Sequence, residues 1–306
     1  MLLSIPLLFG ISEAQDIIGP IDDAIAADER ALDALFLNSS CHHVYLDLGT
    51  NRAVQIRKLY QPHLYPNATV LHRFDQLFGS APRCHVCAIG FEPNPHHKEN
   101  LNRVEKALNA AGAPVLIFRA AASDADSIAK FALPSSRGRT TKEEDWTASM
   151  STPRFGLKRA GYLNLKGETT VRTVDISRML QRVHTHVKSR SGGKIMAKFD
   201  CEGAELRIIP HLLQQQTLCL IDFATIEWHE KMLAAKWFQQ SAYARKIPRT
   251  RSGVLAATSM VNQTRVLIET TIQTTGCGLE MRADEDDESY LHDGAALPNK
   301  GEPICR

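Results

Sequence analysis

The sequence lacks several features that would assign the chain at once to a specialised class. Its most apolar stretch, residues 1–11, is too short to cross a bilayer, which takes about 20 residues. Lys and Arg total 36 against 34 Asp and Glu, and no basic block stands out, so nothing indicates nucleic-acid binding. No internal repeat is present. At 306 residues and 43% hydrophobic, the chain can bury a sizeable core in one large domain or two smaller ones.

Cysteine is present but does not form a recognisable framework. The count of seven is odd and the spacing is irregular, so a small disulfide scaffold is not implied. The segment Cys84-His-Val-Cys87 has the spacing of half a zinc site, but no second pair of cysteines follows it. We therefore do not expect zinc there.

The N-terminus is compatible with two interpretations. Residues 1–11 are apolar, and Ser12 and Ala14 stand where a secretory signal has small residues before its cleavage point, although no Lys or Arg precedes the run. The alternative is an ordinary short helix. Asn-x-Ser/Thr sequons occur at Asn38, Asn67 and Asn262. Together these features favour the secretory pathway or the extracellular space, with a cytoplasmic location as the alternative.

The rest of the chain is organised around residues 44–51, Val-Tyr-Leu-Asp-Leu-Gly-Thr-Asn. An apolar strand, a glycine turn and helical spacing over 52–60 predict the opening of a nucleotide-binding α/β unit. Gly49 lets the backbone approach a ligand closely, and Asp47 can accept hydrogen bonds from a ligand amine or hydroxyl. The alternative is an ordinary strand-to-helix turn in which Asp47 caps the helix.

A second acidic residue follows the next predicted strand, residues 86–91. Glu92 at a strand tip can accept both hydroxyls of a ribose. It lies 45 residues after Asp47, where about 20 is usual in dinucleotide folds, and an elaborated connection over 61–83 accounts for the difference. Pro93 and Pro95 bracket the loop after Glu92 and restrict its backbone, which favours a functional role over a solvated acid.

Small residues follow the third strand, predicted at 114–118. The run 120–123, Ala-Ala-Ala-Ser, leaves room for a flat ring against the backbone. Asp124 could bond to an exocyclic amine of such a ring, or it could simply cap the next turn.

Acids and a histidine end the two later core strands, predicted at 195–199 and 218–226. Asp200 and Glu202 follow the first, and Glu227 and His229 follow the second. In open α/β sheets the carboxyl edge holds the ligand, so these side chains should face it together with Asp47 and Glu92. Two carboxylates there could act as a base, bind a substrate hydroxyl or hold a hard cation.

The remaining pattern completes the domain. Helices are predicted at 15–40, 70–78, 96–111, 175–187, 206–213 and 232–252, and a strand at 169–174, with Asp175 as a helix cap. Residues 134–170 indicate a long loop, either a lid or an inert insertion. Strands at 266–274 and 279–292 would form a C-terminal hairpin. We expect a leading segment over 1–40, one domain over 41–292 and a tail over 293–306.

Taken in order, these motifs resemble one family. VYLDLGTN at 44–51, GFEPNP at 90–95, AAASD at 120–124, TVD at 173–175, KFDCEGAE at 198–205 and IEWHE at 226–230 are similar to the FkbM family of S-adenosylmethionine-dependent methyltransferases. KFDCEGAE is the most specific of them. The resemblance covers about residues 40–230 and extends at most to 292.

The resemblance implies a class I methyltransferase fold. This is a Rossmann-like α/β fold with a seven-stranded, mostly parallel sheet, helices on both faces and an antiparallel C-terminal hairpin. By position, the methionine end of the cofactor would be lined by Asp47, Gly49 and Asn51. The ribose would be held by Glu92, and the adenine would lie near Ser123 and Asp124. The substrate side would be faced by Asp200, Glu202 and Glu205.

One position departs from the family pattern. The family usually has a second glycine after the Asn, where Arg52-Ala53 stands here. A methyl group at Ala53 is tolerated if φ is negative, and otherwise it could narrow the cofactor pocket.

The resulting hypothesis is methyl transfer from S-adenosylmethionine to a hydroxyl of a small molecule or sugar, with nitrogen as a less favoured acceptor. Catalytic roles fall to Asp200, His229 and Glu202. A divalent metal is compatible with these carboxylates but is not expected. The alternative is an inactive methyltransferase-like binding module of the secretory pathway. A nicotinamide-dependent oxidoreductase is disfavoured because no Gly-x-Gly-x-x-Gly follows the first strand.

Overall fold

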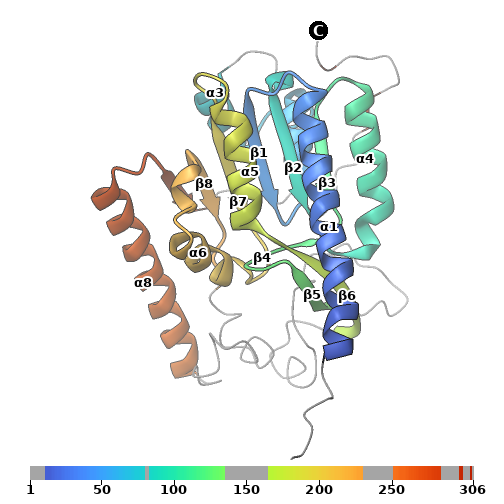
Figure 1. The fold of residues 1–306 in the computed structure, drawn as a ribbon. Helices are drawn as coiled ribbons and strands as arrows, with labels where there is room; N and C mark the ends of the chain where they lie inside the picture. The colour runs from blue at the N-terminus through green and yellow to red at the C-terminus, as the bar shows by residue number, and fades with distance from the viewer. Residues whose placement is uncertain are drawn as a thin grey trace, which may run out of the picture.

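The computed structural model describes residues 11–79, 83–134, 165–229, 251–283, 296–298 and 304, and they form an α/β fold around two sheets (Figure 1). The central sheet has six strands in the order β3-β2-β1-β7-β8-β9, and every neighbouring pair is parallel. A smaller sheet has the order β4-β6-β5. The described residues thus confirm a Rossmann-like, mostly parallel sheet, with one strand fewer than expected.

Most elements lie where the hydrophobic pattern predicts them, but the strand predicted at 218–226 begins only at Phe223, because Leu218–Leu220 form a 3₁₀-helix. The strands are β1 His43–Leu48, β2 Val86–Phe91, β3 Val115–Phe118, β4 Ala121–Ser123, β5 Ser127–Pro134, β6 Leu165–Asp175, β7 Ile195–Phe199, β8 Phe223–Ile226 and β9 Glu280–Ala283. The α-helices are α1 Ile11–Leu37, α2 Val54–Tyr60, α3 Val70–Phe78, α4 Lys98–Ala110, α5 Ile176–Lys188, α6 Glu205–Gln214 and α8 Arg251–Thr275.

Helices cover both faces of the central sheet, and each strand sends alternate side chains to each face. One core combines Leu46 and Ile89 of the strands with apolar residues of α1, α5, α6 and α8. The other combines Tyr45 and Ala88 with residues of α2, α3 and α4. This alternation within β1 and β2 is what a strand covered on both faces requires. The helices lie in front of and behind the sheet accordingly (Figure 1).

The predicted C-terminal hairpin is wrong. Residues 266–274 belong to helix α8, and β9 pairs with β8 in parallel. The β-branched residues of this stretch suggested a strand, but Val261, Ile268 and Ile272 recur at helical spacing and face the core. The hydroxyls of Thr271 and of three other threonines of α8 donate to the carbonyl four residues earlier, which a helix alone allows.

The loop predicted over 134–170 is wrong at its C-terminal end. Residues 165–170 already belong to β6, which pairs with β5 in antiparallel fashion along its length. Residues 135–164 lie outside the described residues, as do 230–250, where a basic helix was predicted. The strand at 169–174 and the cap at Asp175 are confirmed, since the Asp175 carboxylate accepts from the backbone N–H groups of Ser177 and Arg178.

Helix α1 is attached to the domain by ion pairs. Its acidic residues meet basic residues of β6 and α5, in the pairs Asp28–Arg172, Glu29–Arg178 and Asp33–Arg182. Hydrogen bonds from Arg182 lower the pKa of Asp33 to about 2. None of the described helices is both long enough and apolar enough for a membrane span.

Two disulfides join segments that are distant in sequence. Cys41, just before β1, is bonded to Cys87 of β2, and Cys219 is bonded to Cys277 beyond the end of α8. Cys87 therefore belongs to a disulfide rather than to a zinc pair with Cys84. Among the described cysteines, only Cys201 is a free thiol, and it is partly buried.

These bonds can be tested by mass mapping and by denaturation. Proteolytic peptides of the unreduced protein should contain the Cys41–Cys87 and Cys219–Cys277 links. A Cys41→Ala/Cys87→Ala double variant should lose roughly 2–4 kcal/mol of unfolding free energy, because its unfolded chain is less restricted. Cys201→Ala is the control and should leave both links intact. Free thiols at Cys41 and Cys87 in the folded protein would contradict the assignment.

Candidate functional site

The register of the central sheet brings four strand ends to the same level. Leu48 of β1 pairs with Phe91 of β2 on one side and with Phe199 of β7 on the other, and Phe199 pairs with Ile226 of β8. The residues that follow these positions are the turn at Gly49 and the acids Glu92, Asp200 and Glu227. The sequence prediction that these groups share the carboxyl edge is therefore correct.

The turn after β1 is held tightly in place. Gly49 has φ +89°, and a Cβ built on it would lie 1.7 Å from the backbone oxygen of Asp200, so no other residue fits. The N–H groups of Gly49 and Thr50 both donate to the Phe91 carbonyl, at 3.1 and 3.0 Å. The Thr50 hydroxyl bridges β1 to β2, donating to Asp47 O and accepting from Phe91 N. These bonds leave the turn little room to move, and Gly49 is its partly exposed residue.

Ala53 lies in the left-handed region, with φ +64°. A methyl group would be free of strain only with a negative φ, so Ala53 is strained. The left-handed conformation costs roughly 1–2 kcal/mol relative to glycine. Its side chain is fully buried in the core with Ile56 and Leu59. The methyl group thus packs into the core, and the departure from the family pattern costs stability rather than pocket space.

Glu92 is buried and already oriented by backbone. One carboxylate oxygen accepts from Asn51 N at 2.8 Å and the other accepts from Asn94 N at 2.7 Å. Burial, opposed by these bonds and reinforced by the charges of Asp47 and Asp200, raises the pKa of Glu92 to about 7. The link to Asn51 joins the β1 turn to the β2 tip, so the two predicted cofactor segments form one surface.

Two features of this surface fit an S-adenosylmethionine ligand. The Oδ1 atom of Asn51 is buried and has no hydrogen-bond partner among the described residues, so it offers an acceptor to a ligand amine. Each oxygen of Glu92 has a second lone pair for a ribose hydroxyl. Asp47 is completely buried in β1 beneath the turn, which places it as a support of the cradle as well as a candidate ligand contact.

Ser123 ends strand β4 of the smaller sheet, and Asp124 follows it. The Asp124 carboxylate pairs with the Arg207 guanidinium of α6, at 2.5 and 3.2 Å, and accepts from the Ser123 hydroxyl at 3.0 Å. Burial would raise the pKa of Asp124, but the Arg207 charge outweighs it, and the pKa is lowered. No described contact joins these residues to Glu92. An adenine amine that donated to Asp124 would do so beside the Arg207 guanidinium, which already donates to both carboxylate oxygens.

The second half of the edge carries a cluster of acids, which we call the acid-histidine cluster: Asp200, Glu202, Glu205, Glu227 and His229. The Asp200 carboxylate accepts from the Lys198 ammonium at 2.6 Å, and its pKa is lowered because the Lys198 and His229 charges outweigh burial. Glu202 has a left-handed backbone, with φ +51°, and burial raises its pKa to about 8.

His229 lies at the centre of the cluster, held by a fully buried carboxylate. The Glu205 Oε1 atom accepts from both the backbone N and Nδ1 of His229, each at 2.9 Å. This leaves Nε2 facing Glu227 at 3.4 Å, Glu202 at 3.7 Å and Asp200 at 3.9 Å. Burial opposes the charge, but the Glu205 bond and the surrounding carboxylates raise the pKa of His229 to about 10. At neutral pH the ring is therefore a cation.

Sequence reasoning gave too little weight to two of these residues. Lys198 is an ionisable residue inside a buried strand, and that isolated charge in an apolar run was the available signal. Glu205 opens helix α6, and its Oε2 accepts from Gly203 N at 3.0 Å. Nothing in the sequence pattern indicated that it would reach His229 across the turn.

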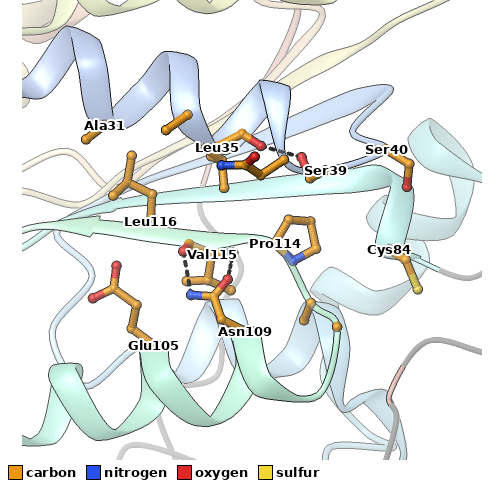
Figure 2. Close-up of a pocket in the computed structure, with 14 residues that line it drawn as sticks. Ala31, Leu35, Ser39, Ser40, Cys84, Glu105, Asn109, Pro114, Val115 and Leu116 are labelled. Atoms are coloured by element: carbon orange, nitrogen blue, oxygen red, sulfur yellow. Dashed lines mark hydrogen bonds between the residues drawn. The ribbon is translucent and has the colours of Figure 1, made fainter.

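A separate cavity of about 580 Å³ lies at the opposite end of the sheet, lined by residues just before β1 and at the start of β3. Figure 2 shows its lining residues. Its walls come from α1, α4 and the start of β3. There Asn109 of α4 both donates to and accepts from the backbone of Val115, and Glu105 accepts from Ile117 N. These side chains occupy the outer backbone groups of an edge strand and so protect it from pairing with another chain. None of the predicted site residues lines this cavity.

The charge state of His229 gives a test of the cluster. In chelator-treated protein its ring should stay protonated through pH 8 and lose the proton near pH 10, as read by NMR of ring C–H signals assigned with His229→Gln. Because the folded pKa lies above the ordinary value of 6.5, the stabilisation from this proton is complete below pH 6.5 and is lost as pH rises to 10. Glu205→Gln should lower the pKa. A midpoint near 6.5 in the unaltered protein would contradict the geometry.

The comparisons with known proteins agree with this arrangement. Comparison with curated proteins and with solved structures returned no match. The family model described as the methyltransferase FkbM domain matches residues 47–251, which is more than half of the chain and includes the β1 turn, Glu92 and the acid-histidine cluster. The chain belongs to the FkbM methyltransferase family.

Proposed function

We propose that the protein transfers a methyl group from S-adenosylmethionine to a hydroxyl oxygen of a small molecule or sugar. The observation that carries the proposal is the meeting, at one sheet edge, of a backbone cradle and a polar cluster. The Gly49 turn, whose glycine lies against the backbone of Asp200, joins the two. A cofactor on the cradle would therefore present its reactive end to the groups that follow β7 and β8.

The cofactor would be held by groups that the fold has already positioned. Asn51 Oδ1 and Asp47 would face its methionine portion, and Glu92 would accept the ribose hydroxyls. Ser123 and Asp124 would lie toward the adenine. When bound, the cofactor supplies an electrophilic methyl group on a sulfonium. Much of the rate then comes from placing the acceptor oxygen in line with that methyl group.

The acid-histidine cluster would handle the acceptor proton and position the acceptor oxygen. Asp200 is ionised and can accept the hydroxyl proton, although its lowered pKa makes it a weak base. His229, as a cation, would hold the cluster carboxylates in place rather than act as the base. Glu202 can donate a hydrogen bond while it holds its proton, which its raised pKa favours at neutral pH.

We also propose that the protein matures in the secretory pathway. The support comes from two described disulfides, which persist in oxidising compartments. In addition, the sequon asparagines Asn38, Asn67 and Asn262 are all exposed to solvent. A cytoplasmic protein would be expected to keep these cysteines reduced.

Glycosylation tests the location. Protein secreted by a eukaryotic host should lose mass on treatment with peptide N-glycosidase. Asn67→Gln should remove one increment of that loss, since Asn67 lies exposed in the turn before α3. Asn102→Gln, at an exposed asparagine outside any sequon, is the control and should not change the loss. Unglycosylated protein that stays inside the cell with free Cys41 and Cys87 thiols would contradict the proposal.

Cofactor binding is the decisive experiment for the function. Calorimetric titration with S-adenosylmethionine and S-adenosylhomocysteine should give saturable binding at one site. Glu92→Ala should abolish it by removing the ribose acceptor, and affinity in the unaltered protein should fall as pH drops below about 7, where Glu92 gains a proton.

Two variants serve as controls for this titration. Glu99→Ala changes an exposed acid on α4 and should bind normally. Asp200→Asn lies on the acceptor side and should also keep cofactor binding. A folded protein that binds neither ligand would overturn the methyltransferase proposal and favour the inactive binding module.

A further inference from the structure

The acid-histidine cluster contains a set of donors that point at one another. Asp200, Glu227 and His229 each offer one ligand atom, and the three atoms lie within 4.8 Å of one another. They come from the ends of two adjacent strands, β7 and β8, whose pairing at Phe199 and Ile226 fixes their relative positions. Asp200 and Glu227 directly follow the two paired strands, and His229 lies two residues beyond Glu227, where Glu205 holds it.

The orientations of the three side chains are fixed by residues outside the set. Lys198 takes the Oδ2 atom of Asp200, while Oδ1 is the atom nearest His229 Nε2. Glu205, which is fully buried, holds His229 through Nδ1 and so directs Nε2 at the carboxylates. A carboxylate bonded to the far nitrogen of a histidine is the usual support of a metal-binding imidazole.

The spacing suits a divalent cation. Nε2 of His229 lies 3.4 Å from Glu227 Oε1 and 3.9 Å from Asp200 Oδ1. Neighbouring ligands of an octahedral cation with bonds of about 2.1 Å are roughly 3 Å apart, so these two distances lie within about 1 Å of that spacing. The third separation, between the two carboxylate oxygens, is at most 4.8 Å. Two carboxylates and one imidazole suit Mn²⁺ or Mg²⁺ better than a soft metal.

We propose that Asp200, Glu227 and His229 bind a divalent cation of the Mn²⁺ or Mg²⁺ type. The cation takes the lone pair of Nε2 in place of the proton, and it offsets the repulsion between the two carboxylates. Three protein donors leave positions for water and for an acceptor oxygen. Under the proposed function, on which this role rests, a hydroxyl bound there becomes more acidic and needs no strong base.

The experiment is a titration of chelator-treated, full-length protein with Mn²⁺. The free ion is followed by electron paramagnetic resonance, and Mg²⁺ is added as a competitor. We expect one Mn²⁺ per chain. Glu227→Gln should weaken it roughly tenfold or more, because a charged ligand is lost. Glu280→Gln on the neighbouring strand β9 is a matched control, since its side chain is 42% exposed against 45% for Glu227, and it should bind as the unaltered protein does.

Each outcome decides the matter. Absence of saturable binding, or equal affinity in Glu227→Gln and the unaltered protein, would overturn the cation site. If circular dichroism shows that Glu227→Gln does not fold, His229→Gln replaces it under the same criterion. Titration of the same metal-free protein with S-adenosylmethionine separates the two proposals. Cofactor binding without Mn²⁺ binding removes the cation site alone, whereas Mn²⁺ binding without cofactor binding removes the methyltransferase proposal alone.

Discussion

The contact between Gly49 and the backbone of Asp200 is the constraint on which the site depends. It requires a residue without a Cβ after β1, and it holds the β1 turn directly against the tip of β7. The shared register of β1, β2, β7 and β8 then places Glu92 and Glu227 level with them. A cofactor cradle and an acceptor cluster thus become neighbours.

Charge is distributed unevenly along this edge. On the cofactor side, burial keeps the pKa of Glu92 high for a carboxylate, although the N–H groups of Asn51 and Asn94 donate to it. On the acceptor side, several carboxylates crowd around His229 and give it a strongly held proton. Such crowding would destabilise the fold unless a cation, either that proton or a metal ion, were present.

The residues that strain or stabilise the fold are distinct from those that form the ligand surface. Ala53 adopts a strained left-handed backbone, but its side chain packs into the core behind the turn, so the strain does not reach the ligand surface. The two disulfides lie near the amino ends of the central strands, and the ion pairs of α1 join it to β6 and α5; both stabilise the frame. These interactions stabilise the fold enough to offset the cost of burying charged groups at the carboxyl edge.

The sequence by itself determined the strands that carry the site and the order of its acids, because buried parallel strands are continuous apolar runs and the polar residues that end them stand out. It failed at α8, where β-branched residues concealed a helical period, and it did not indicate that Arg207 would occupy Asp124 or that Glu205 would hold His229. Those outcomes depend on which side chains meet across separate elements. Only the tertiary structure decides such meetings, since hydrogen bonds and charge interactions depend on distances that sequence spacing does not contain.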